Sequence, residues 1–75
     1  MYIDMEKKIL EILSSVLGVQ VDETCSQANC AKWNSINQLN IVVELEMEFN
    51  ISLEPEEIGE MKSYNDIIRI LKTKQ

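Results

Sequence analysis

The residue with the most obvious capacity for chemistry in this chain is Ser35, which lies in the run Trp33, Asn34, Ser35, Ile36. Its hydroxyl could be the attachment point of a covalent group, or the serine could simply cap a helix, as serines often do. A serine that acts as its own nucleophile needs a neighbouring base, usually histidine, and the chain has no histidine. We therefore expect no catalytic residue and no enzymatic activity, which makes a small hydrolase a poor alternative.

The two cysteines add little to this chemistry. Cys25 and Cys30 lie in a polar stretch without a further thiol or imidazole that would complete a zinc site, and no segment has the ligand pattern of a calcium-binding loop. No metal site is predicted. Small domains that depend on disulfides are usually much richer in cysteine, so two reduced thiols are expected, with a local disulfide as the alternative.

Size and charge limit the classes of function. A chain of 75 residues is expected to form a single domain over residues 1–75, with one core and little room for an enclosed active site. A net charge of -6 argues against nucleic-acid binding, favours partners with basic surfaces and favours a monomer through mutual repulsion. Because the sequence contains neither a signal-peptide pattern nor an apolar run of membrane-spanning length, we expect a cytoplasmic protein without membrane insertion.

Apolar periodicity and helix end signals predict four helices. The first runs from about residue 4 to 17 and stops at Gly18, and a long polar loop follows over residues 19–32. The second begins at Asn34 or Ser35 and ends near Phe49.

The two remaining helices have their own start signals. Pro55 suits the first turn of a short third helix that Gly59 limits, and Ser63 with Asp66 resembles a capping box at the start of the fourth. The predicted fold is an all-α, small four-helix bundle with a long loop between helices one and two and a short third helix.

The second predicted helix has more apolar surface than a small bundle can easily bury. One stripe suits the core, and a second lies beside it, made of Ile36, Leu39, Val43 and Met47. We expect part of this second stripe to be exposed as a contact surface, although all of it could be core. A run of glutamates between Glu44 and Glu60, without an intervening Lys or Arg, could solvate the protein or complete a docking surface for basic partners.

This region resembles the acyl carrier protein family, whose carriers bear phosphopantetheine. The family motif is an acid, a serine and a leucine at the start of the second of four helices, followed by alternating apolar and acidic residues. The matching positions in this chain are Asn34, Ser35, Ile36, Leu39, Val43, Glu44, Leu45, Glu46, Glu48 and Phe49. The resemblance extends through the turn at 51–53, the acidic segment 55–58 and the isoleucine-rich last helix, and Trp33 is similar to discrete, specialised carriers.

The resemblance implies that a phosphopantetheinyl transferase moves phosphopantetheine from coenzyme A to Ser35. The thiol of this cofactor would then carry an acyl or aminoacyl thioester between loading and condensing enzymes, as in fatty acid or polyketide biosynthesis. Contacts with partners would come from Asn34, Ile36, Leu39, Val43, Glu46 and Met47. A cavity for the acyl chain would be lined by Ile41, Leu45, Leu53, Ile58, Met61 and Ile67. The alternative is an unmodified protein of the same fold that docks through the exposed face of its second helix.

The chain departs from the family at the residue before the serine, where Asn34 replaces an acid. Asn37 and Asn40 likewise stand at positions that are often acidic. Asparagine still caps a helix well, so the fold should be retained. An amide carries no charge that a basic transferase surface could recognise. Two alternatives therefore stay open: a diverged carrier that is modified by its own dedicated transferase, and a carrier that is poorly modified.

Overall fold

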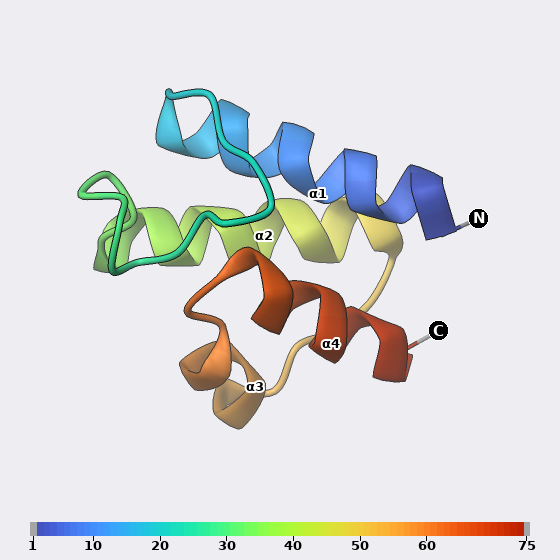
Figure 1. The fold of residues 1–75 in the computed structure, drawn as a ribbon. Helices are drawn as coiled ribbons and strands as arrows, with labels where there is room; N and C mark the ends of the chain where they lie inside the picture. The colour runs from blue at the N-terminus through green and yellow to red at the C-terminus, as the bar shows by residue number, and fades with distance from the viewer. Residues whose placement is uncertain (1, 75) are drawn as a thin grey trace.

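The computed structural model describes residues 2–74, with side chains from residue 5 onward, and this part of the chain forms four helices and no named strand. Their order and bounds are α1 Tyr2–Leu17, α2 Ser35–Phe49, α3 Pro55–Glu60 and α4 Tyr64–Lys74 (Figure 1). The predicted all-α fold with a short third helix is therefore confirmed. Between residues 2 and 74 no helix is long and apolar enough to span a membrane.

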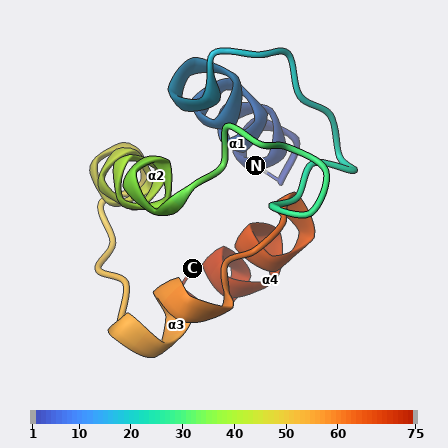
Figure 2. The same ribbon diagram turned by 90° about the vertical axis from the view of Figure 1, so that its left-hand side faces the viewer.

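The three longer helices surround the core. The chain runs in opposite directions along α1 and α2 (Figure 1), and the view in Figure 2 shows α1, α2 and α4 around a common interior, with α3 leading into α4. The apolar spacing of the sequence explains this arrangement, because residues three or four apart share one helix face. The buried side chains are Met5, Ile9, Ile12, Leu13, Leu17, Cys25, Trp33, Ile41, Val42, Leu45, Leu53, Met61, Tyr64, Ile67, Ile70 and Leu71.

Gly18 ends α1 as predicted. Its φ of 70° lies in the left-handed region, and its N–H donates to the Ser14 carbonyl at 2.9 Å. The start of α1 differs from the prediction, because the helix begins at Tyr2 and Asp4 lies inside it. An acidic residue suits the first turn of a helix as well as its cap, so aspartate is an imprecise start signal.

The long loop after α1 is fixed by backbone pairing with the α3–α4 connection. The N–H of Gln27 donates to the Lys62 carbonyl, and the N–H of Tyr64 donates to the Cys25 carbonyl, each at 2.9 Å. These two bonds surround the isolated bridge between residues 26 and 63. The loop is therefore held against the end of the bundle from which α2 starts.

The predicted cap of α4 is confirmed with one difference. The Asp66 N–H donates to the Ser63 hydroxyl at 3.1 Å, as in a capping box. The return bond is displaced by one residue, because the Asp66 carboxylate accepts the N–H of Lys62 at 3.2 Å. Gly59 does not end α3, which continues to Glu60.

Three of the glutamates between residues 44 and 60 form ion pairs with other helices. Glu48 lies 3.5 Å from Lys8 of α1, and two pairs connect α3 with α4, Glu60 with Arg69 at 3.5 Å and Glu57 with Lys74 at 2.8 Å. The glutamate run is therefore partly neutralised by cations distant in sequence. The Lys8–Glu48 and Arg69–Glu60 pairs are exposed and each contributes little to stability, whereas the Glu57–Lys74 pair is partly buried.

We expect Glu57→Gln to lower the melting temperature at about pH 7 and to have little effect well below the ordinary glutamate pKa of about 4.3. The Glu54 N–H, and then Lys74, hold the pKa of Glu57 below its usual value. A carboxyl with a lowered folded-state pKa stabilises the fold above its unfolded pKa, and this stabilisation is lost as the pH falls through the folded value. Thermal melts at both pH values would check this, with Glu56→Gln as the control. An equal loss at both pH values would contradict it.

Candidate functional site

Ser35 is the first residue of α2, and the residue before it provides the cap. Asn34 is extended, with φ of -105° and ψ of -175°, and its side-chain oxygen accepts the Asn37 N–H at 2.9 Å. The Asn34 carbonyl accepts the N–H of Gln38 at 2.8 Å. Ser35 is exposed, and its hydroxyl makes no hydrogen bond to the described part of the chain. The serine is therefore not the N-cap, and its hydroxyl is accessible for reaction.

Replacing Asn34 by alanine should lower the free energy of unfolding by about 1 kcal/mol, the usual cost of removing an N-cap side chain. Asn34→Asp is the matched control, because a carboxylate oxygen can still accept the Asn37 N–H. Urea denaturation followed by helical circular dichroism measures both variants. If alanine and aspartate proved equally stable at this position, the capping role would be refuted.

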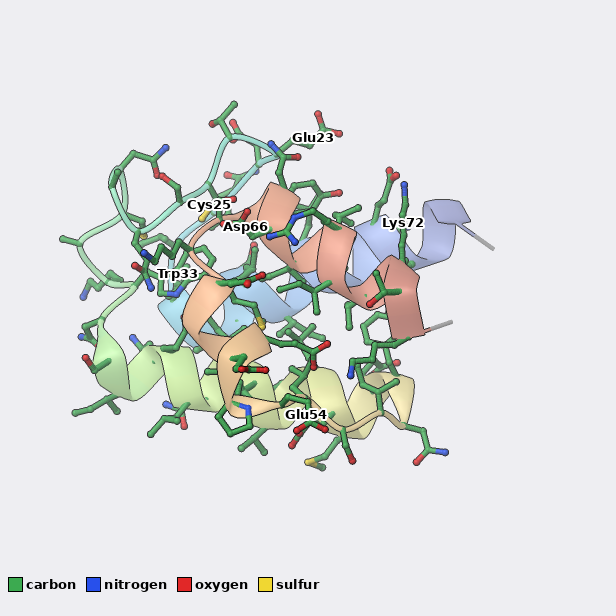
Figure 3. All side chains as sticks on the ribbon, turned by 90° about the horizontal axis from the view of Figure 1, so that it is seen from below. Glu23, Cys25, Trp33, Glu54, Asp66 and Lys72 are labelled. Atoms are coloured by element: carbon green, nitrogen blue, oxygen red, sulfur yellow. The ribbon has the colours of Figure 1, made fainter. Side chains whose placement is uncertain are left out.

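Gln38 joins the start of α2 to the loop that precedes it and to α3. Its Oε1 accepts the Trp33 Nε1–H at 2.5 Å, and its Nε2 donates to the Ile58 carbonyl of α3 at 2.9 Å. The Gln27 amide adds a longer contact to Oε1 at 3.4 Å. Figure 3 shows Trp33 in the region where the long loop, the start of α2 and α3 come together. Gln38 was not among the site residues predicted from the sequence, although it is a polar residue on the core-facing side of the helix.

An open groove of about 480 Å³ lies beside the serine. Its lining comes from the long loop, the first turn of α2 and the end of α3. Among the side chains that the structure describes, no carboxylate lines the groove, although the chain has 13 acidic residues. The lining residues are Gln27, Trp33, Asn34, Ser35, Gln38, Leu39, Ile58, Gly59 and Lys62.

The second apolar stripe of α2 is exposed, as the width of its apolar surface predicted. The exposed fractions are 73% for Ile36, 61% for Leu39, 50% for Val43 and 73% for Met47. The alternative that all of these residues are core is therefore wrong. Because monomeric proteins rarely expose such contiguous apolar surface without a reason, the stripe fits a contact surface. That it binds partner enzymes stays a prediction.

Glu46 has a structural contact that the sequence analysis did not foresee. Its side chain is half-buried, and its Oε2 accepts the Leu53 N–H at 2.9 Å. Its backbone carbonyl accepts the N–H of Ile51 at 3.2 Å, after Asn50 has turned the chain with a left-handed φ of 54°. Glu46 thus fixes the connection from α2 to α3. Its contact with a partner stays a prediction.

The residues predicted to line an acyl cavity gather in the core. All but one are buried, and the half-buried Ile58 packs against the same cluster. The buried members are Ile41, Leu45, Leu53, Met61 and Ile67. The structure therefore brings the set together, and its use by an acyl chain stays a prediction.

The cysteines lie outside this site. Cys25 is buried and Cys30 half-buried, and both are free thiols. Burial, followed by the nearby Cys30 and Asp22, raises the pKa of the Cys25 thiol, which disfavours its reactive thiolate form. Within the described residues, no three Cys, Asp or Glu side chains are grouped to hold a metal.

Comparison with known proteins finds similar structures but no matching sequence family. No family model matches the sequence. A protein from Mycobacterium tuberculosis assigned as an acyl carrier protein superposes with a TM-score of 0.83 at 19% identity, over 95% of this chain and 99% of that one. An acyl carrier protein from Thermotoga maritima superposes with a TM-score of 0.75 at 28% identity, over 96% of this chain and 87% of that one. The resemblance of the sequence to the acyl carrier protein family is thereby confirmed, and the chain has the acyl carrier protein fold.

Proposed function

We propose that this protein is a carrier whose Ser35 bears phosphopantetheine and whose cofactor thiol transfers an acyl or aminoacyl thioester between partner enzymes. The observation that carries the proposal is the exposed Ser35 hydroxyl, which is placed at the first position of α2 and is left unused by the helix cap. The acyl carrier protein fold supports the same assignment. A carrier of this kind needs no catalytic residue of its own.

The attachment chemistry suits a chain without histidine. The Ser35 oxygen would form a bond to the phosphorus that bears pantetheine, the pyrophosphate bridge of coenzyme A would break, and adenosine 3′,5′-bisphosphate would leave. The hydroxyl proton would pass to a base of the transferase, because this chain has no histidine to accept it. The serine has only to be accessible.

The surroundings of Ser35 fit a phosphodiester. The first N–H groups of a helix lack intrahelical partners and, with the helix dipole, favour an anion. In α2, the Asn34 cap uses the N–H of Asn37. The described lining of the groove beside the serine includes Lys62 and no carboxylate, so an attached phosphate would not meet a like charge from these residues.

Docking of the transferase and of later enzymes would use the exposed face of α2. The apolar stripe supplies the surface to be buried, and exposed acids of the same helix, Glu44 and Glu48, would attract a basic partner. The predicted contact residues are Asn34, Ile36, Leu39, Val43, Glu46 and Met47. An unmodified interaction protein would use the same face, so attachment at Ser35 distinguishes the two functions.

The test is to incubate the protein with coenzyme A and a broad-specificity phosphopantetheinyl transferase and to measure its intact mass. We expect an increase by one phosphopantetheine, and no increase for Ser35→Ala. Ser52→Ala, which removes another exposed hydroxyl, is the control and should be modified normally. Failure with every transferase tried, or modification at another residue, would reject the carrier and favour the unmodified interaction protein.

A further inference from the structure

The residues next to Ser35 determine where the cargo of the carrier can lie, which rests on the proposed attachment at that serine. Along α2, Ser35, Gln38, Ile41 and Leu45 follow one another at intervals of three and four residues, which places neighbours on adjoining turns of one helix face. Ile41 and Leu45 are buried and Ser35 is exposed. Gln38 therefore stands between the attachment point and the core.

The Gln38 amide is held at both ends. Its oxygen accepts the indole N–H of Trp33, a residue only 4% exposed, and its nitrogen donates to the carbonyl of Ile58. These bonds connect the loop, α2 and α3 at Gln38, one turn along α2 from the serine. An acyl chain that passed Gln38 to enter the core would separate them and leave the buried indole N–H without its acceptor, which is unfavourable.

The space outside this barrier has a different character. The groove beside Ser35 is open, and polar side chains contribute to its walls, among them Gln27, Gln38 and Lys62. An acyl group held there could form hydrogen bonds but would leave a long alkyl chain in contact with water. The core residues behind Gln38 are shielded from solvent, with Ile41, Leu45 and Ile67 fully buried.

We propose that Gln38 is a specificity-determining residue that closes the core to the cargo. The carrier then holds short or hydrogen-bonding acyl groups in the open groove, and it does not shelter long alkyl chains between α2 and α3. The six core residues that could line an acyl cavity serve packing alone while the Trp33–Gln38–Ile58 bonds are in place.

The experiment uses phosphopantetheine-bearing protein loaded with an octanoyl group. For the wild type, we expect the amide ¹H–¹⁵N signals of Ile41, Leu45 and Ile67 to match those of the unloaded holo protein. We also expect hydroxylamine to cleave the thioester as fast as it cleaves octanoyl-pantetheine. In Gln38→Ala, these core signals should shift and cleavage should slow by roughly fivefold or more, the factor that one net hydrogen bond represents.

Asn40→Ala is the matched control, because it removes another side-chain amide of α2 at an exposed position outside the groove, where the amide donates to Asn37 and not to α3. It should behave as the wild type. Shifted core signals and slowed cleavage in wild-type octanoyl protein would overturn the proposal, whether or not Gln38→Ala folds. Failure of the proposed function is distinguishable, because phosphopantetheine would then never appear on Ser35 and no octanoyl protein could be made.

Discussion

Trp33→Ala is expected to lower the free energy of unfolding by about 3–5 kcal/mol, the range found when large buried aromatic side chains are truncated. The indole is 4% exposed and packs in the core cluster, and its N–H bonds to Gln38. Small domains have total stabilities of only about 5–15 kcal/mol, so this loss would bring the protein near its unfolding threshold. Urea denaturation should be followed by helical circular dichroism, because Trp33 is the only tryptophan and the variant lacks its fluorescence.

Trp33→Phe separates the contribution of burial from that of the hydrogen bond. Phenylalanine retains much of the apolar area but cannot donate to the Gln38 oxygen. We expect it to retain more than half of the stability that alanine loses. Equal stability of wild type and Trp33→Ala would show that the residue is not a core anchor. A phenylalanine variant as unstable as alanine would assign most of the effect to the indole N–H.

The helix ends were predictable because their signals are local. Asn34 before α2, Gly18 after α1 and Pro55 at the start of α3 each act through the conformation or the hydrogen bonds of their own turn. Such residues give the same result in almost any tertiary context. The sequence left open whether Asn34 or Ser35 caps α2, and the structure assigns the cap to Asn34 and the first helical position to Ser35.

The contacts around Ser35 were not predictable in the same way. Gln38 meets Ile58, and Glu46 meets Leu53, across connections whose geometry no local pattern defines. Gln38 nevertheless left a signal, because it lies seven residues before Leu45 and so shares the core-facing side of α2. A polar side chain at such a position needs hydrogen-bond partners. The sequence could indicate this need, and only the fold identifies Trp33 and Ile58 as the partners.

The charges that compensate the glutamate run could not be recognised from the sequence, because the paired cations lie far away along the chain. Between residues 44 and 60 the sequence contains no cation, which suggested a surface of one sign. The fold brings Lys8, Arg69 and Lys74 to three of these acids from helices at either end of the chain. In the proposed docking, the exposed acids of α2 would therefore supply only part of the attraction, and burial of the apolar stripe should account for much of the binding energy.

Replacing Leu39 and Met47 together by lysine is accordingly expected to lower the transferase kcat/KM by roughly 30-fold or more, since buried anchors at interfaces each contribute at least about 1 kcal/mol. The two side chains are 61% and 73% exposed. Lysine removes apolar contact area and places positive charge against a basic partner. Because the positions are exposed, unfolding stability should change by no more than about 0.5 kcal/mol. The rate of mass increase at several protein concentrations gives kcat/KM.

The matched control is the double variant Ser15→Lys, Val19→Lys, which adds the same two charges at exposed positions outside α2. If net charge alone governed encounter with the transferase, both double variants would slow modification equally, and added salt would remove most of the difference from wild type. A docking surface on α2 predicts instead that the control stays close to wild type and that a large deficit of the Leu39, Met47 variant persists in salt. Lost apolar contacts are not screened by ions, so this persistence would identify burial of the stripe as the main source of recognition.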